Sequence, residues 1–158
     1  MLLALRELQL FLQDLAARDA GRLNMWELEI QAGGVSTISL EEAPGAVIPD
    51  NDPGGVERSL STTEAGTVKD ISVSVDITHT WIGDLQIKLI SPAGTEVVLH
   101  NRSGGSADNI IRSYSAAAVP ALSTLQGQQL AGTWKLKIAD LEAQDVGKLN
   151  KWELQITR

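Results

Sequence analysis

The sequence of 158 residues contains no cysteine, which excludes disulfide bonds and thiolate metal ligands. No run of about 18 apolar residues occurs, so the sequence predicts no transmembrane helix. Basic residues are few: 13 Lys and Arg stand against 20 Asp and Glu, and the net charge of −7 argues against nucleic-acid or anionic-membrane partners. The G-x-S-x-G and H-E-x-x-H signatures are also absent, which argues against two common classes of hydrolase.

An alternation of apolar and polar residues with a period of two is the main structural signal. In "VKDISVSVDITH", which begins at Val68, Ile71, Val73, Val75 and Ile77 share one face with His79. This spacing is typical of a half-buried β-strand. "GDLQIKLIS", "TEVVLHN", "TWKLKIAD" and "KLNKWELQI" show related patterns, separated by stretches rich in Gly, Pro, Asn and Ser. The sequence therefore predicts an all-β protein, either an antiparallel β-sandwich or a jelly roll.

One segment occurs twice. "DLAARDAGRLNMWELEI" begins at Asp14 and "DLEAQDVGKLNKWELQI" begins at Asp140, with eleven of seventeen positions identical. The spacing is about one domain length, as a tandem repeat requires. The start of the chain could form either a helix or a strand, and the repeat favours a strand because it aligns Leu10 with Leu136.

Three stretches resemble one protein family: "AVIPDNDPGGVERSL", "VSVDITHTWIGDLQIKLISPAGTEVVLHNR" and "GQQLAGTWKLKIADLEAQDVGKLNKWELQI". They are similar to the P domain, or P/Homo B domain, of kexin- and furin-like proprotein convertases and bacterial subtilisin-like proteases. The resemblance covers roughly residues 46–156. It implies a jelly-roll-like antiparallel β-sandwich of about eight strands, and a non-catalytic role beside a secreted protease. This sequence departs from the family between Ser113 and Gly127, where a longer acidic insertion is usual.

The repeat and the resemblance together predict the domain organisation. Residues 1–32 would be the C-terminal strand pair of a preceding P domain, residues 33–45 a linker, and residues 46–158 a complete P domain. Because a lone hairpin is marginal in water, residues 1–32 would dock on an exposed sheet edge, pair with another molecule or fray. Of these we expect association with another copy of the chain, with strand exchange as one route.

The predicted structural core contains His79, Trp134, Trp152, Gly147 and Asn150. His79 lies in phase with inward residues, so a structural histidine is favoured over a catalytic one, whereas the phase of His100 predicts a surface position. Gly147 is expected to adopt a left-handed turn conformation. Asn150 is expected to bond its own backbone. The tryptophans could form a sugar-stacking platform, but their phase favours the core.

Calcium is the candidate cofactor. Asp76, Asp84, Asp140 and Asp145 lie at predicted strand ends or in loops, and Ca²⁺ prefers oxygen ligands from such loops. A further acidic turn spans residues 50–52. No EF-hand spacing occurs, and structural turn residues remain the alternative; in particular, Asp84 could cap its own turn. Trp81 lies in the loop "HTWIGD" and is predicted to contact a partner domain.

The function predicted is therefore that of an accessory module that stabilises or regulates an attached secreted subtilisin-like serine protease. The alternative is a repeat module of an extracellular binding or adhesion protein; a free-standing hydrolase is a third, formal alternative. The expected partners are a neighbouring protease catalytic domain or an adjacent P-domain repeat. The resemblance implies an extracellular or periplasmic location.

Overall fold

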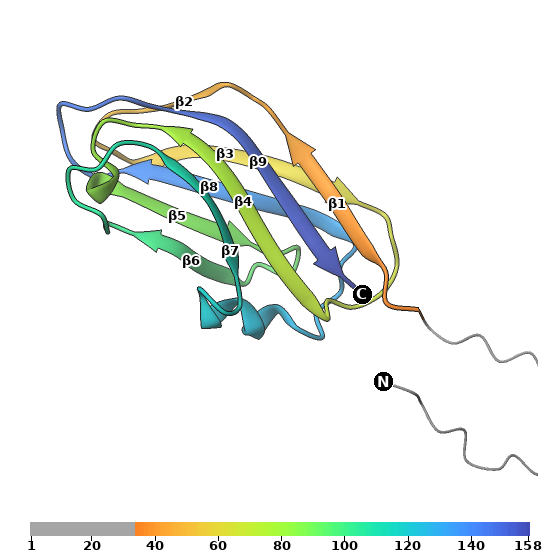
Figure 1. Ribbon diagram of the computed structural model, residues 1–158. Coiled ribbons are helices and arrows are strands. Elements are labelled where there is room, and N and C mark those ends of the chain that lie inside the picture. The colour runs from red at the N-terminus through yellow and green to blue at the C-terminus, as the bar shows by residue number, and fades with distance from the viewer. Residues whose placement is uncertain (1–33) are drawn as a thin grey trace, which may run out of the picture. The chain divides into compact units, whose positions relative to one another are not determined.

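The computed structural model describes residues 34–158, which form one compact unit (Figure 1). This unit is a sandwich of two antiparallel sheets, so the predicted fold class is confirmed, with nine strands in the described residues. The five-stranded sheet contains β1 (Thr37–Glu42), β9 (Gly147–Thr157), β4 (Asp70–Thr78) and β7 (Ile110–Ser115) in that order, with β2 (Ala46–Ile48) also paired to β9. The four-stranded sheet has the order β3 (Asp52–Thr62), β8 (Gly132–Asp140), β5 (Leu85–Ile90), β6 (Glu96–Asn101).

Helices are short in this unit. A one-turn 3₁₀ helix, η1 (Ile82–Asp84), precedes β5, and a second, η2 (Pro120–Leu125), lies in the connection between β7 and β8. Neither of these, nor any other helix among residues 34–158, is long and apolar enough to cross a membrane.

The core lies between the two sheets and follows the period-two pattern. Ile71, Val73, Val75 and Ile77 of β4 all point inward and are buried. Residues of one face of a strand alternate with residues of the other, so the polar residues between them face outward. The inward residues of β5, β8 and β9 follow the same rule.

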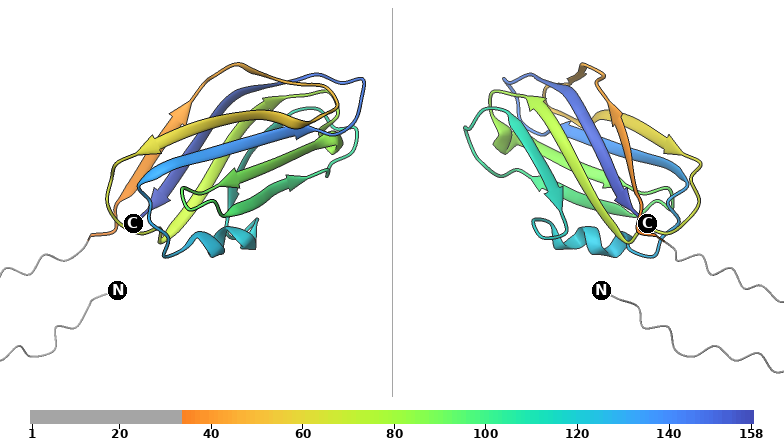
Figure 2. Two further views of the ribbon diagram at one scale, coloured as in Figure 1. Left: turned by 180° about the vertical axis from the view of Figure 1, so that it is seen from behind. Right: turned by 45° about the vertical axis from the view of Figure 1, so that its right-hand side comes forward.

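β8 and β9 follow one another in the sequence but belong to different sheets, so they do not form a hairpin with each other. β8 pairs with β3 on one side and β5 on the other, while β9 lies between β4 and the strands β1 and β2 (Figure 2). Trp134 on β8 and Trp152 on β9 are both fully buried. Removal of β8 and β9 would therefore leave both sheets without a central strand.

The expected linker at residues 33–45 contains part of the sandwich. β1 pairs with β9 from Thr37↔Thr157 to Glu42↔Trp152, so the domain begins before residue 46. The strand TISLEE alternates only between exposed and partly buried residues, which explains why its apolar pattern is weak. The strand pair predicted for residues 1–32 lies outside the described residues.

Two other elements of the structure carry weak sequence signals. In β7, Ile110 and Tyr114 point inward but Ile111 points outward and is exposed, so apolar residues do not alternate with polar ones. η2 buries Leu122 and Leu125, three residues apart, within a stretch of low periodicity.

The connections divide between the two ends of the sandwich. The β2–β3, β4–β5, β6–β7 and β8–β9 connections lie at one end, because each joins a strand that ends there to one that starts there. Residue 36 and the C-terminus lie together at the opposite end, where Ser36 and Arg158 exchange backbone hydrogen bonds (Figure 1).

Candidate functional site

Most predicted site residues gather at the end formed by four connections, residues 49–51, 79–84, 102–109 and 141–146, with the adjoining strand ends. We refer to this surface as the four-loop end. Its connections are hydrogen-bonded to one another. Ile82 N–H donates to Ala107 O at 3.0 Å and Gly83 N–H donates to Gly105 O at 2.9 Å. A Cβ on Gly83 would lie 2.9 Å from Gly105 Cα, so these two loops approach too closely for any side chain at position 83.

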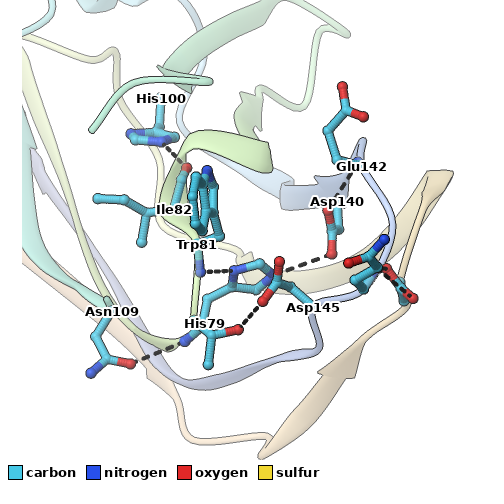
Figure 3. Close-up of polar contacts among 11 residues, drawn as sticks. His79, Trp81, Ile82, His100, Asn109, Asp140, Glu142 and Asp145 are labelled. Carbon is cyan, nitrogen blue, oxygen red and sulfur yellow. Dashed lines mark hydrogen bonds and ion pairs between the residues drawn. The ribbon is translucent and has the colours of Figure 1, made fainter. Parts of the chain in front are cut away.

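His79 is buried at the centre of this end, with 1% of its surface exposed. Trp81 N–H donates to His79 Nδ1 at 3.0 Å, which requires that nitrogen to be unprotonated (Figure 3). Nε2 therefore carries the proton and donates to Asp140 Oδ2 at 3.2 Å. Asn109 closes the arrangement: its side-chain oxygen accepts from His79 N–H at 3.0 Å.

Both ring nitrogens of His79 are thus occupied by structural partners. A general base must present a free nitrogen to a nucleophile or to substrate. No serine or threonine hydroxyl bonds this ring among residues 34–158. The geometry favours the structural interpretation of His79 over the catalytic one.

Gly147 has a different role from the one expected. Its φ is not positive, so a left-handed turn does not explain it. A Cβ at Gly147 would overlap His79 Cδ2 and would lie 3.1 Å from Ile48 Cδ1. Glycine is required here because the imidazole packs directly against the backbone of β9.

Asn150 bonds across the sheet rather than to its own backbone. Its Nδ2 donates to Asp76 Oδ1 at 3.0 Å and to Thr78 Oγ1 at 2.8 Å. The side chain therefore joins β9 to the end of β4. A bulge in the β4–β9 pairing between Asp76 and Ile77 brings these groups together.

His100 is buried, with 6% of its surface exposed, and the predicted surface position is wrong. A β-bulge in the β5–β6 pair is the reason: Ile87 pairs with His100 but Lys88 pairs with Val98, which leaves Leu99 as the extra residue. Both Leu99 and His100 can then turn inward. His100 Nε2 donates to Ile82 O at 2.9 Å, and this bond helps to hold η1 in place (Figure 3).

Asp84 is buried, with 8% of its residue surface exposed. Its backbone N–H donates to Trp81 O at 3.2 Å, but its carboxylate accepts no hydrogen bond among the described residues, so it does not cap the turn through its side chain. Burial raises the pKa of this carboxyl, and the negative charges of Asp140, Asp145 and Glu142 raise it further.

The four aspartates predicted to bind calcium do not form a metal site in the part of the chain that the structure describes. No group of three or more His, Asp or Glu side chains there is arranged to hold a metal ion. Asp140 accepts from His79 and from Glu142 N–H, Asp145 accepts from Thr80 Oγ1, and Asp76 accepts from Asn150. Three of the four carboxylates thus already accept hydrogen bonds, and Asp84 alone falls short of the six to eight oxygen ligands that Ca²⁺ needs.

Trp81 is the exposed aromatic residue of the four-loop end. Its backbone is fixed by the bond to His79, while 45% of its surface remains exposed (Figure 3). Val146, in the β8–β9 connection, is 69% exposed. The other two tryptophans in the described residues are buried, so the structure does not form a sugar-stacking platform from Trp134 and Trp152.

Residues 68–156 match the family model of the proprotein convertase P-domain. The chain belongs to this family. The matched residues run from just before β4, through the His79 and Trp81 loop, to the end of β9. The P domain resemblance seen in the sequence is thereby confirmed.

Relatives of this P domain are proteases by name. The chain is 38% identical over 112 residues to a calcium-dependent protease from Trichormus variabilis, an alignment that covers 69% of this chain and 17% of the relative. It is 36% identical over 118 residues to leupeptin-inactivating enzyme 1 from Streptomyces exfoliatus, covering 73% of this chain and 25% of the relative. The chain thus spans a quarter or less of the length of these two proteins.

The fold also occurs in a solved protease structure. The Aeromonas sobria serine protease, crystallised with its chaperone, superposes with a TM-score of 0.64 at 20% identity. The match covers 78% of this chain and 27% of that chain, and at this identity it concerns the fold alone.

Proposed function

We propose that this P domain is a non-catalytic accessory module that stabilises or regulates an attached secreted, subtilisin-like serine protease. The observation that carries the proposal is the family match together with the small share of each named protease that the chain covers. The engaged imidazole of His79 is consistent with a role other than catalysis. An extracellular or periplasmic location is part of the same proposal.

The mechanism is interdomain binding. A domain that binds the native protease but not its unfolded chain lowers the free energy of the native state, as any ligand does. Covalent attachment raises the effective concentration, so even a weak interface contributes. Such a module needs a stable core of its own, which residues 34–158 have, and exposed apolar side chains such as Trp81 and Val146 are available to an interface.

A deletion experiment tests the proposal. In the polypeptide that carries this chain and a protease domain, removing residues 34–158 should lower the temperature at which the protease loses activity. Purified residues 1–158 should not cleave peptide substrates. A polypeptide without a subtilisin-like Asp, His and Ser domain, or a protease whose thermal inactivation is unchanged by the deletion, would contradict the proposal.

A second candidate function is a repeat module in a multidomain extracellular protein, and one observation favours it. When residues 14–30 are aligned with residues 140–156, every position that differs is exposed in the β8–β9 connection or on β9. Those positions are Glu142, Gln144, Val146, Lys148, Lys151 and Gln155. The identical positions include the buried Asp140, Gly147, Leu149, Trp152, Leu154 and Ile156. The N-terminal copy therefore retains the residues that a P-domain core requires.

In this second proposal, the N-terminal copy completes the sheets of a preceding repeat, which we call its host. Asp14 aligns with Asp140, which accepts a hydrogen bond from His79. Gly21 aligns with Gly147, where a Cβ would overlap the His79 ring. The host would then carry a histidine equivalent to His79. The sequence before Asp14 suits a place in residues 34–131 less well, because Arg6 aligns with Gly132, which has a φ of 128° and packs against Pro92.

Light scattering distinguishes a preceding repeat from strand exchange between two copies of the chain. Exchange predicts that residues 1–158 form a dimer or larger species that disappears when residues 1–32 are deleted. A preceding repeat predicts a monomer in both cases, and it predicts further P-domain strands upstream in the same polypeptide. A monomer without such upstream strands would contradict both.

A further inference from the structure

The acidic side chains of this domain are distributed unevenly. Away from the four-loop end, ion pairs neutralise many of them; these pairs are Glu41–Lys151, Glu42–Arg58, Glu57–Lys135, Glu64–Arg158 and Glu96–Lys88. The four-loop end and its strand ends carry Asp50, Asp52, Asp84, Asp108, Asp140, Glu142 and Asp145. In the described residues, Arg102 is the sole Lys or Arg there, and it pairs with Glu142.

One carboxylate at this end has little exposed surface and no hydrogen-bond partner among the described residues. Asp84 is more than nine-tenths buried and accepts no hydrogen bond through its side chain among residues 34–158, although it is close enough to Asp140, Asp145 and Glu142 to feel their charges. Tyr114 Oη is the one buried side-chain polar atom without a partner in the described residues, so the Asp84 oxygens keep contact with solvent. A carboxylate with little exposed surface and negative charges nearby gains from a positive partner that reaches it from solvent.

An exposed aromatic residue belongs to the same turn as this carboxylate. Trp81 and Asp84 belong to the same tight turn, closed by the bond from Asp84 N–H to Trp81 O at 3.2 Å. Hydrogen bonds to His79, to His100 and to the loop at Gly105 fix the position of this turn. A cation placed over an indole face and paired with a nearby carboxylate gains from both contacts. The turn presents both groups in a fixed arrangement, which limits the entropy lost on binding.

We propose that the four-loop end is a docking surface for a basic protein segment, in which a lysine or arginine side chain stacks on Trp81 and its charge pairs with Asp84. Charge complementarity selects this occupant over an acidic or purely apolar one. A bare metal ion is disfavoured because the neighbouring carboxylates are committed to hydrogen bonds. This proposal goes beyond the accessory function and does not depend on it.

A decalysine peptide is the probe that tests the surface. It is titrated into residues 1–158 at low salt, and the indole N–H signals are followed by NMR, with the Trp81 signal identified by its loss in Trp81→Phe. We expect that signal to shift, and we expect Trp81→Ala and Asp84→Asn each to raise the Kd about fivefold. Binding should disappear near 1 M NaCl, where the Debye length is about 3 Å. Decaglutamate should not bind.

Matched controls make the test specific to this surface. Glu57→Gln and Glu96→Gln change the net charge as Asp84→Asn does, but they lie on β3 and β6 outside the four-loop end. Each should leave the Kd within about twofold, because an exposed charge away from the site interacts weakly. Thermal unfolding of each variant establishes that it is folded at the titration temperature.

Three results would overturn the proposal. In the first, decalysine does not shift the Trp81 signal. In the second, Glu57→Gln and Glu96→Gln weaken binding as much as Asp84→Asn, which would indicate a general acidic attraction. In the third, CaCl₂ displaces decalysine when compared at equal ionic strength, which would make the four-loop end a metal site rather than a docking surface.

Discussion

Trp152 on the last strand donates a hydrogen bond from its indole Nε1 to Glu42 Oε2 on the first strand, at 3.2 Å. Arg58 pairs with the same carboxylate. The fully buried indole thus has its single polar atom satisfied by a residue of the segment that the sequence assigned to a linker. β1 is therefore an integral part of the domain.

Replacing Glu42 by alanine should lower the free energy of unfolding by about 1–3 kcal/mol, because the indole N–H of Trp152 would be left without an acceptor. Urea unfolding of residues 1–158 measures this change. Glu41→Ala is the matched control on the adjacent, solvent-facing position, where loss of the pair with Lys151 should cost at most about 1 kcal/mol. Equal losses in the two variants would contradict the role given to Glu42.

The contribution of Glu42 should also depend on pH. The hydrogen bond from Arg58 lowers the pKa of Glu42 most, and the bond from Trp152 lowers it further. The folded state then binds a proton less readily than the unfolded state, so Glu42 contributes stability above its ordinary pKa and loses it as the pH falls through the lower folded value. The stability difference between the wild type and Glu42→Gln should be largest near neutral pH and should shrink in acid. A difference that stayed constant would contradict this pairing.

Gly147→Ala should destabilise the domain by about 1–3 kcal/mol, because the added methyl would overlap the imidazole of His79. Gly34→Ala is the control, since a Cβ there meets no atom within 4 Å and its φ is not in the left-handed region. Calorimetry of the two variants compares their Tm values. A shift in Gly34→Ala as large as that in Gly147→Ala would remove the explanation.

Asp84→Asn should raise the Tm of the isolated chain at neutral pH. The folded-state pKa of Asp84 is raised by burial first and by Asp140 next, so its ionised form costs stability above the ordinary pKa of an aspartate. As the pH falls through the raised value, the wild-type carboxyl takes up a proton, the cost is relieved, and the advantage of the variant should vanish. A variant that is less stable than wild type at neutral pH would show that the carboxylate has a partner.

His79 should remain in the tautomer that carries its proton on Nε2. The bond from Trp81 N–H to Nδ1 excludes a proton on Nδ1, and Asp140 accepts from Nε2. The ¹⁵N chemical shifts of the two ring nitrogens distinguish the tautomers. Asp140→Ala should lower the free energy of unfolding by about 1–3 kcal/mol because Nε2–H would lose its buried acceptor. Exchange of the ring proton between both nitrogens would contradict the assignment.

Local alternation was enough to predict the core strands, but not the positions where register changes. The inward residues of β4 and the placement of Trp134 and Trp152 followed from a period of two. His100 could not be placed, because its burial depends on a bulge opposite Lys88 in another strand. β1 was missed for a related reason: its pairing with β9 is non-local, and its own residues are only partly buried.

The candidate site was predictable as a set of residues but not as an arrangement. The repeat and the family motifs pointed to His79, Trp81, Asp84 and Asp140, and all four lie at one end of the sandwich. The hydrogen bonds that occupy Asp140, and the absence of one at Asp84, depend on how four separate connections meet. Such contacts between residues that are distant in sequence have no signature in composition or spacing.

The antiparallel β1–β9 pair places Thr37 opposite Thr157, so the chain enters and leaves the domain at neighbouring points. The hydrogen bonds of such a pair run perpendicular to the strands. A mechanical load applied between residues 36 and 158 would therefore pull along those bonds. It would separate the strands one residue pair at a time, from Ser36–Arg158 inward. In a polypeptide under tension, β1 would detach first. The hydrogen bond between Trp152 and Glu42 would break only after the other residue pairs of β1 and β9 had separated.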